Sequence, residues 1–284
     1  MRTRSIRLAA SALLLGLLLA ACSEKDDEGS DATGTDVTTT TASDGAGASI
    51  AGMLDGKTLK ICSDIPYAPM EMEDASKPSG YGGFDIDLVQ AIVDEAGGEL
   101  EVSVVGFSAI FAALDAKTCD AVVSSVSINP ERQQSMAFTQ PYLDSGQSLL
   151  VRKEDADTYK TLDDLAGKKI GVQEGTTGAD YAKENTPEGA TIQEAPGAAD
   201  LFALLNAKSV DAVLQDYPIN AYQATKDSGT VLQEQFPTKE QYGMAVRKDD
   251  PTTLRLLDEG ITLMRENGTY DALYAEYLGK KIEG

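Results

Sequence analysis

Apolar and polar positions follow two patterns along the chain, and each pattern predicts a type of element. The segment TLKICSD at 58–64 is typical of a short strand. The segment 83–98 instead has apolar residues at helical spacing, namely Ile86, Val89, Ile92, Val93 and Ala96. Strands are also predicted at 100–107 and 120–125, with a helix at 108–117 between them. This alternation of strands and helices is typical of a parallel sheet with covering helices.

The second half of the chain repeats this plan. Strands are predicted at 168–175, 190–195 and 211–215, and helices at 177–185 and 198–208. Each helix again lies between two strands, so we expect a second sheet of the same kind.

The last part of the chain departs from the plan. A predicted strand at 243–248 is followed by two helices that start near Pro251 and Gly268. We expect these helices to pack on the first half. The chain then crosses twice between two lobes, near 145–148 and near 241–244.

Part of the sequence is itself repeated. Residues 110–125 read IFAALDAKTCDAVVSS, and residues 201–216 read LFALLNAKSVDAVLQD, which is 201 − 110 = 91 positions later. A second pair, LDGKTLKICSD at 54–64 and LAGKKIGVQEG at 165–175, is also similar. Two similar half-molecules are the simplest explanation. The copies differ where the last strand ends, in Ser-Ser in the first and in Gln-Asp in the second.

The N-terminus has the pattern of a targeting signal. Three arginines precede an apolar run at 8–21, which is too short to span a bilayer comfortably. The run ends in Leu-Ala-Ala and is followed by Cys22, an arrangement that resembles the bacterial lipobox. We therefore expect residues 1–21 to be a lipoprotein signal peptide. Cys22 would carry the lipid that anchors the protein to the bacterial cell membrane, outside the cytoplasm.

The remaining chain divides into a tether and two lobes. Residues 22–52 have too few large apolar side chains to offset the entropy of ordering, so we expect a flexible tether. The total of 284 residues is enough for about two domains. We expect lobe 1 at 53–145 and 243–284, and lobe 2 at 146–242.

The composition excludes several classes of function. Lys and Arg number 24 and Asp and Glu number 46, which gives a formal net charge of −22. A chain this acidic does not bind nucleic acid or anionic headgroups through a basic surface, although a local site can still bind a small charged molecule. Histidine is absent, which excludes imidazole zinc sites and nucleophiles paired with His. We expect no metal and no cofactor.

Two cysteines remain besides Cys22. Cys62 lies on the first predicted strand, and Cys119 lies at the start of a strand that we expect beside it. Outside the cytoplasm the two could form a disulfide. The disulfide is favoured, but the two could also be small buried residues, because the strand register cannot be derived from the sequence.

Candidate binding residues gather where the predicted strands end. Ligands of open α/β sheets bind beyond the carboxyl ends of the strands. Ten residues are expected there: Asp64, Tyr67, Phe107, Ser124, Ser125, Ser127, Arg132, Thr176, Thr177 and Asp216. Arg132 can bind a carboxylate with two hydrogen bonds, helped by Ser127 and by the helix that starts at Thr177. Asp216 can accept hydrogen bonds from an ammonium group. The set predicts a site for a zwitterion, whose binding closes the two lobes.

At these residues the chain resembles the polar-amino-acid family of solute-binding proteins that serve ABC importers. The matching stretches are SDIPYAP (63–69), GFDIDL (83–88), DAVVSSVSINPERQQSMAFTQPY (120–142), LAGKKIGVQEGTT (165–177) and VDAVLQD (210–216). The resemblance implies an α/β, two-lobed fold of the type II periplasmic-binding-protein kind. Each lobe of that fold is a mostly parallel sheet with flanking helices, and two crossovers form a hinge.

The resemblance also implies roles for the residues of the ligand's amino-acid end. Arg132 matches the family's carboxylate-binding arginine, and Ser125 and Ser127 match its serines. Thr177 matches the threonine at the helix start, and Asp216 matches the aspartate that binds the ammonium group.

The ligand side chain is less well defined by the sequence. Tyr67 and Phe107 match the family's aromatic walls, and Asp64 matches a carboxylate often found near the ligand side chain. Met70 departs from the family, which commonly has Phe there. An acidic ligand would need a second cation, so we expect a basic amino acid first and a glutamine-like one second.

The function that the resemblance implies is that of a non-catalytic, monomeric receptor. It would capture a free amino acid and deliver it to the permease subunits of an ABC transporter. An enzyme is one alternative, because the fold also supports periplasmic dehydratases and Glu174 could act as a general acid or base. A ligand-sensing domain for a signalling partner is another. Taken singly, Arg132 could be a surface residue, Asp216 a turn residue, and Ser124 a partner for backbone groups.

Overall fold

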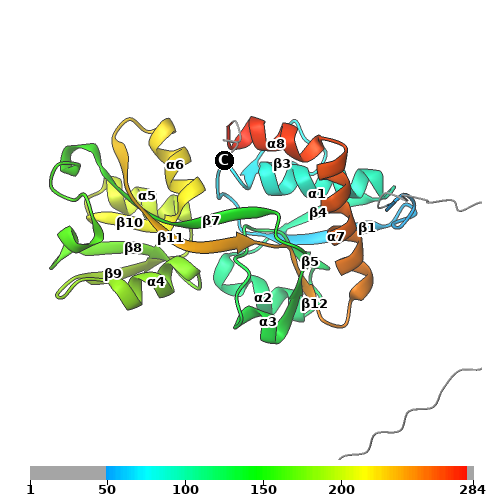
Figure 1. Ribbon diagram of the computed structural model, residues 1–284, viewed down its shortest axis with the longest axis horizontal. Helices are drawn as coiled ribbons and strands as arrows, with labels where there is room; N and C mark the ends of the chain where they lie inside the picture. Colours follow the sequence, from blue (N-terminus) through cyan, green and yellow to red (C-terminus); the bar gives the residue numbers. More distant parts are fainter. Residues whose placement is uncertain (1–48, 280–284) are drawn as a thin grey trace, which may run out of the picture. The chain divides into compact units, whose positions relative to one another are not determined.

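The computed structural model describes residues 49–279, which form an α/β fold of two lobes (Figure 1). The expected signal peptide, Cys22 and most of the expected tether lie outside these residues. Each lobe is built on a five-stranded sheet. Within the described range, no helix combines the length and the apolar character that crossing a membrane requires.

The first lobe holds the sheet with strand order β4-β1-β5-β12-β6. Its strands are β1 (Thr58–Ser63), β4 (Glu99–Val104), β5 (Ala121–Val122), β6 (Met136–Phe138) and β12 (Ala245–Arg247). Its helices are α1 (Phe84–Glu95), α2 (Phe107–Asp115), α3 (Arg132–Ser135), α7 (Pro251–Glu266) and α8 (Thr269–Tyr277). A small ribbon of β2 (Met72–Glu73) and β3 (Tyr81–Gly82) precedes α1. The C-terminal helices α7 and α8 pack against α1.

The second lobe holds the sheet with strand order β11-β7-β10-β8-β9. Its strands are β7 (Leu143–Arg152), β8 (Lys169–Gln173), β9 (Thr191–Ala195), β10 (Ala212–Asp216) and β11 (Thr230–Tyr242). Its α-helices are α4 (Thr177–Asn185), α5 (Ala198–Asn206) and α6 (Tyr217–Lys226), and two 3₁₀ turns cover Lys153–Asp155 and Leu162–Leu165. Apolar clusters lie on both faces of this sheet, one with α4 and one with α5.

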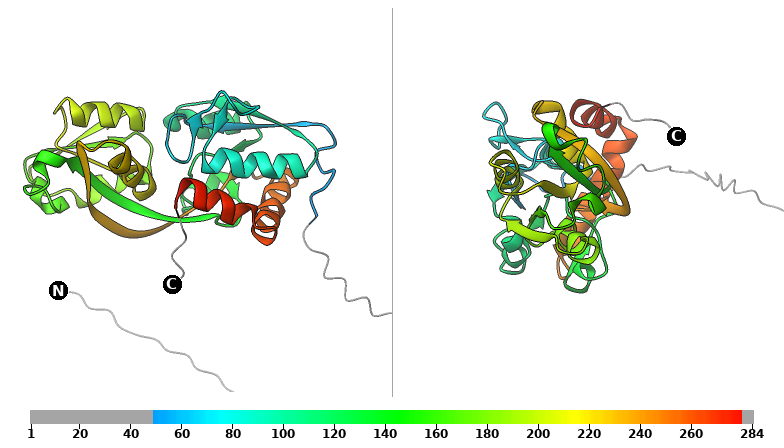
Figure 2. Two further views of the ribbon diagram at one scale, coloured as in Figure 1. Left: turned by 90° about the horizontal axis from the view of Figure 1, so that it is seen from above. Right: turned by 90° about the vertical axis from the view of Figure 1, so that its left-hand side faces the viewer.

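Both sheets are mixed, and the repeat explains how. In each lobe the three strands of the repeated plan run parallel, with β1 between β4 and β5 and with β8 between β9 and β10. The remaining strands pair antiparallel, β12 with β5 and β6 in the first lobe and β7 with β10 and β11 in the second. β7 and β11 pair from Leu143 opposite Tyr242 to Thr230 opposite Arg152. Figure 2 shows these two long strands running together along one side of the two lobes.

The two copies of the repeat fold alike down to single hydrogen bonds. The helix of each copy ends in a lysine with a left-handed backbone, Lys117 with φ of 60° and Lys208 with φ of 59°. The aspartate three residues later accepts a hydrogen bond from the first-strand backbone in both lobes. Asp120 Oδ2 lies 3.0 Å from the nitrogen of Lys60, and Asp211 Oδ2 lies 2.9 Å from that of Lys169.

These contacts also correct the strand alignment of the repeat. Lys60 and Lys169 are equivalent, although an ungapped match of 54–64 with 165–175 places them two positions apart. The first copy has two extra residues after its Gly-Lys turn. The structural counterpart of Asp64 is therefore Gln173.

The structure contains the disulfide that the sequence left open. Cys62 in β1 and Cys119 just before β5 are joined, with their Cα atoms 5.7 Å apart. β1 and β5 are neighbours in the sheet, as expected for the first and third strands of the plan.

Candidate functional site

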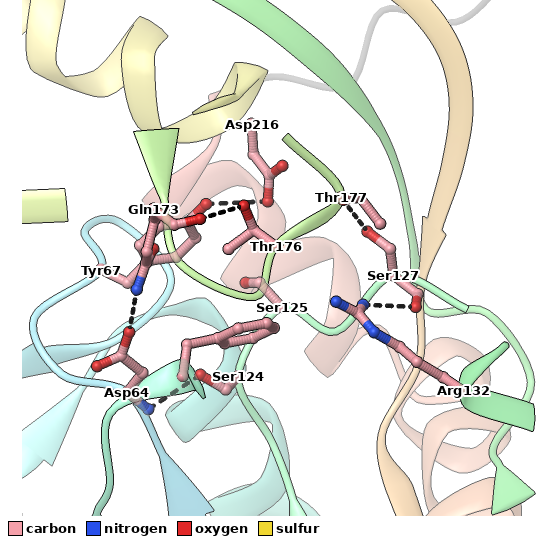
Figure 3. Close-up of a pocket in the computed structure, with 11 residues that line it drawn as sticks. Asp64, Tyr67, Ser124, Ser125, Ser127, Arg132, Gln173, Thr176, Thr177 and Asp216 are labelled. Carbon is pink, nitrogen blue, oxygen red and sulfur yellow. Dashed lines mark hydrogen bonds between the residues drawn. The ribbon is translucent and has the colours of Figure 1, made fainter. Parts of the chain in front are cut away.

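One pocket brings together all ten residues that the sequence placed at the strand ends. It is lined by Asp64, Tyr67, Phe107, Ser124, Ser125, Ser127, Arg132, Gln173, Thr176, Thr177 and Asp216 (Figure 3). Both lobes contribute, and Gln173 is the one lining residue that the sequence analysis did not name. Glu174, the general acid or base of the enzyme alternative, is not among the lining residues.

The first-lobe wall is set by the chain that follows β5. Ser124 Oγ accepts a hydrogen bond from the backbone nitrogen of Asp64 at 3.0 Å, which ties the ends of β1 and β5 together. Ser125 has a left-handed backbone with φ of 47°, a conformation that a non-glycine residue adopts only under local constraint. The constraint comes from Asp85, whose Oδ2 accepts from the backbone nitrogen of Ser125 at 2.7 Å.

A pair of buried carboxyl groups supports this wall from beneath. Asp85 and Glu71 are fully buried, and the hydroxyl of Ser125 donates to Glu71 Oε1 at 3.3 Å. Tyr142 donates to Asp85 Oδ2 at 2.7 Å. Burial raises the pKa of Glu71 well above its usual value, and the nearby Asp85 charge raises it further. The pair could not be predicted from the sequence, because the partners become neighbours only when α1 packs beneath the strand end.

Arg132 is the cation of the pocket. It opens α3, where its backbone nitrogen donates to Asn129 Oδ1 at 2.8 Å. Its guanidinium lies over the rings of Phe107 and Phe111, at 5.4 Å and 5.1 Å from their centroids. Burial lowers the pKa of Arg132, and nearby acidic side chains oppose that shift. Such a desolvated guanidinium strongly favours an anionic partner.

The guanidinium also connects the two lobes. Its Nη1 donates to the backbone oxygen of Ser127 at 2.9 Å, and its Nη2 donates to that of Gly175 at 3.3 Å. Gly175 immediately precedes α4, where the Oγ1 of Thr176 caps the helix by accepting from the nitrogen of Ala179 at 3.1 Å. The start of α4 therefore presents backbone N–H groups beside the Arg132 side chain.

Asp216 is the anion on the other side, at the end of β10. Its carboxylate accepts hydrogen bonds from Tyr67 Oη at 2.9 Å, Tyr242 Oη at 2.6 Å and Gln147 Nε2 at 2.6 Å. Burial, together with the charge of Glu240, raises the pKa of Asp216 to about 6. The carboxylate thus lies in an environment that would favour a cationic partner.

The lobes touch directly at the pocket. Gln173 Nε2 donates to Asp64 Oδ2 at 2.5 Å, and Figure 3 shows the two side chains pointing toward each other from opposite lobes. Because Gln173 is the structural counterpart of Asp64, equivalent strand ends face each other across the cleft. Gln173 could therefore have been predicted by aligning the two copies. An ungapped alignment does not pair it with Asp64, because the first copy has two extra residues.

Two further polar residues near the pocket, Gln147 and Glu240, were also missed. They lie on β7 and β11, and neither strand was predicted by the sequence pattern. Within residues 49–279, acidic and cysteine side chains do not group in threes as metal ligands would.

The sequence of residues 59–280 matches the profile of the bacterial extracellular solute-binding proteins, family 3. The L-cystine-binding protein TcyJ of Escherichia coli strain K12 is 30% identical over 227 residues, which cover 79% of this chain and 84% of TcyJ. An ancestral arginine-binding protein with bound glutamine superposes with a TM-score of 0.73 at 31% identity, covering 78% of this chain and 98% of that one. The ancestral amino acid-binding protein AncCDT-1, a precursor of cyclohexadienyl dehydratase, superposes with a TM-score of 0.71 at 35% identity, covering 78% and 95%.

Proposed function

The chain belongs to family 3 of the bacterial extracellular solute-binding proteins, and from that premise we propose that it binds a basic or glutamine-like amino acid and delivers it to an ABC transporter permease. One observation carries the proposal: Arg132 and Asp216, of opposite charge and from opposite lobes, line the same pocket. A free amino acid has the matching pair of charges. Its binding would satisfy both lobes at once and favour the closed cleft.

The proposed orientation follows from the contacts. The ligand α-carboxylate would lie toward Arg132 and the start of α4, and its ammonium group toward Asp216. The ligand side chain would then extend between Tyr67 and Phe107 toward Asp64. A cationic or amide group there gains a carboxylate acceptor and an aromatic face.

The balance of charge supports a basic ligand over an acidic one. Asp64 and Asp216 line the pocket and Glu240 lies next to it, whereas Arg132 is the one cation among the lining residues. A glutamine-like ligand is the second candidate. It is supported by the structural neighbour described as an arginine-binding protein and bound to glutamine.

We propose that the protein binds its ligand without transforming it. Relatives such as the L-cystine-binding protein are binding proteins, and the AncCDT-1 structure is the observation that keeps a dehydratase-like reaction as an alternative. The apolar run before Cys22 supports a lipoprotein anchored outside the cytoplasm, and we propose that it acts as a monomer.

Calorimetry against the twenty amino acids tests the proposal. We expect one class of ligand with roughly micromolar affinity or tighter, about −8 kcal/mol. Arg132→Ala should lose about 2–5 kcal/mol of it, because the ligand carboxylate would be left unpaired. Arg255→Ala, which removes an arginine paired with Glu259 on α7, is the matched control and should bind normally. The proposal fails if no amino acid binds, and the site assignment fails if Arg132→Ala binds like the wild type.

A further inference from the structure

Glu240, on the crossover strand β11, holds an unusual position beside the pocket. One carboxylate oxygen accepts from Ser127 Oγ at 2.5 Å and from Thr177 Oγ1 at 2.6 Å. The other accepts from Gln147 Nε2 at 2.9 Å and from Thr238 Oγ1 at 2.7 Å. Ser127 belongs to the first lobe and Thr177 to the second, so this single side chain bridges the lobes.

These bonds use hydrogen atoms that a ligand would need. A serine or threonine hydroxyl has one hydrogen to donate. In this structure, Ser127 and Thr177 both donate that hydrogen to Glu240, which lies behind them and outside the lining residues. The same two hydroxyls face the place where the proposed function puts the α-carboxylate of the amino acid.

Glu240 is ionised at neutral pH and is therefore a strong acceptor for these hydrogen bonds. Burial acts to raise its pKa, but the hydrogen bonds from its four donors outweigh burial and leave the pKa below its usual value. The side chain is therefore a carboxylate at neutral pH. A second carboxylate at the same two hydroxyls would meet like charge and no free hydrogen.

We propose that Glu240 is an internal competitor of the ligand, and that binding exchanges its carboxylate for the α-carboxylate of the amino acid at Ser127 and Thr177. The inference rests on the proposed function, because it assumes an amino acid in this pocket. Glu240 then lowers affinity in two ways: it stabilises a closed cleft that lacks ligand, and it withholds two donors until it is displaced. The protein would then bind its amino acid less tightly than it would without the Glu240 carboxylate.

The variant Glu240→Gln tests the exchange, with L-arginine and L-glutamine as calorimetric probes. The amide has nearly the same shape, carries no charge and is a weaker acceptor, so we expect about tenfold tighter binding, or 1.4 kcal/mol. Asp144→Asn is the matched control. It removes one negative charge from the other crossover strand, where Asp144 pairs with Gln241, and should leave affinity unchanged.

Glu240→Ala provides a second variant in case the amide does not fold, and thermal unfolding of each variant reports folding separately. Tighter binding by a folded Glu240 variant supports the inference. Equal or weaker binding by folded variants, with a wild type that binds, overturns the inference and leaves the proposed function standing. Absence of binding to both probes in the wild type and in the variants overturns the proposed ligand class and this inference together.

Discussion

Asp216 is the residue at which folding and binding make opposite demands. Its carboxylate is buried among hydrogen-bond donors but has no cation within ion-pair distance among the described residues. Burial raises its pKa from 3.8 to about 6, so the fold favours the neutral acid. Binding of an ammonium group favours the carboxylate. Proteins commonly accept such a cost at functional positions.

Asp216→Asn should therefore stabilise the protein while abolishing tight binding. Because the pKa of Asp216 is raised in the folded protein, ionisation of this carboxyl lowers the free energy of unfolding. The loss is absent below pH 3.8, grows as pH rises to about 6, and is complete above that. Asp216→Asn should therefore raise the free energy of unfolding by at most about 3 kcal/mol near neutral pH. The gain is reduced because Tyr67, Tyr242 and Gln147 make weaker hydrogen bonds to an amide than to a carboxylate. Thermal unfolding should show a higher Tm for the variant near pH 7.5 and no gain near pH 4. A Tm gain that persists at the lower pH would contradict this account.

At the scale of residues, the side chains that line the pocket could be predicted from the sequence, but the buried carboxyl groups that hold them could not. Residues such as Arg132 and Asp216 follow predicted strands or open predicted helices, so their position at one sheet edge follows from local pattern. Glu71 and Glu240 lie at distant points in the chain and meet the site only through tertiary packing. Their roles could not be predicted, because nothing in the local pattern specifies which hydroxyl an isolated carboxylate will reach.

At the scale of elements, the repeat shows how one turn is built twice. After α2, the backbone nitrogens of Lys117 and Thr118 donate to the carbonyls of Leu114 and Ala113. Lys208 and Ser209 make the corresponding bonds after α5. Each lysine has a left-handed backbone at a position where glycine is usual. A residue with a Cβ destabilises the fold by roughly 1 kcal/mol in this conformation.

Lys117→Gly and Lys208→Gly should each stabilise their lobe by about 0.5–1 kcal/mol, because glycine removes the strain at a slightly greater entropy cost in the unfolded chain. Chemical denaturation measures the change. Lys160→Gly is a matched control on an exposed lysine whose φ is not positive, and it should gain nothing. Equal gains at all three positions would indicate a charge effect and not relief of backbone strain.

The two long strands that the sequence did not predict, β7 and β11, have a common physical cause. β11 is largely polar, and it contains Pro237, which argues against a strand when read locally. Its pairing with β7 is irregular between Phe236 and Glu240, which accommodates the proline. β7 and β11 thus depend on each other over a long sequence separation, whereas α1 or α5 could be predicted from its own periodicity.

At the scale of the whole molecule, charge bears on how a ligand arrives. The formal net charge of −22 attracts a cation and leaves a neutral molecule unaffected. Asp64, Asp216 and Glu240 add local negative potential at the pocket. Long-range attraction of this kind acts mainly on the association rate and weakens as salt screens it.

The association rate constant of L-arginine should therefore fall roughly threefold to tenfold between about 10 mM and about 300 mM salt. That of L-glutamine, which has no net charge, should change little and is the internal control. Stopped-flow mixing can follow tyrosine fluorescence, since the chain has 11 Tyr and no Trp. If the two amino acids show the same salt dependence, the net charge does not steer the ligand. Preference for a basic amino acid would then have to arise inside the pocket, from Asp64 and its aromatic neighbours.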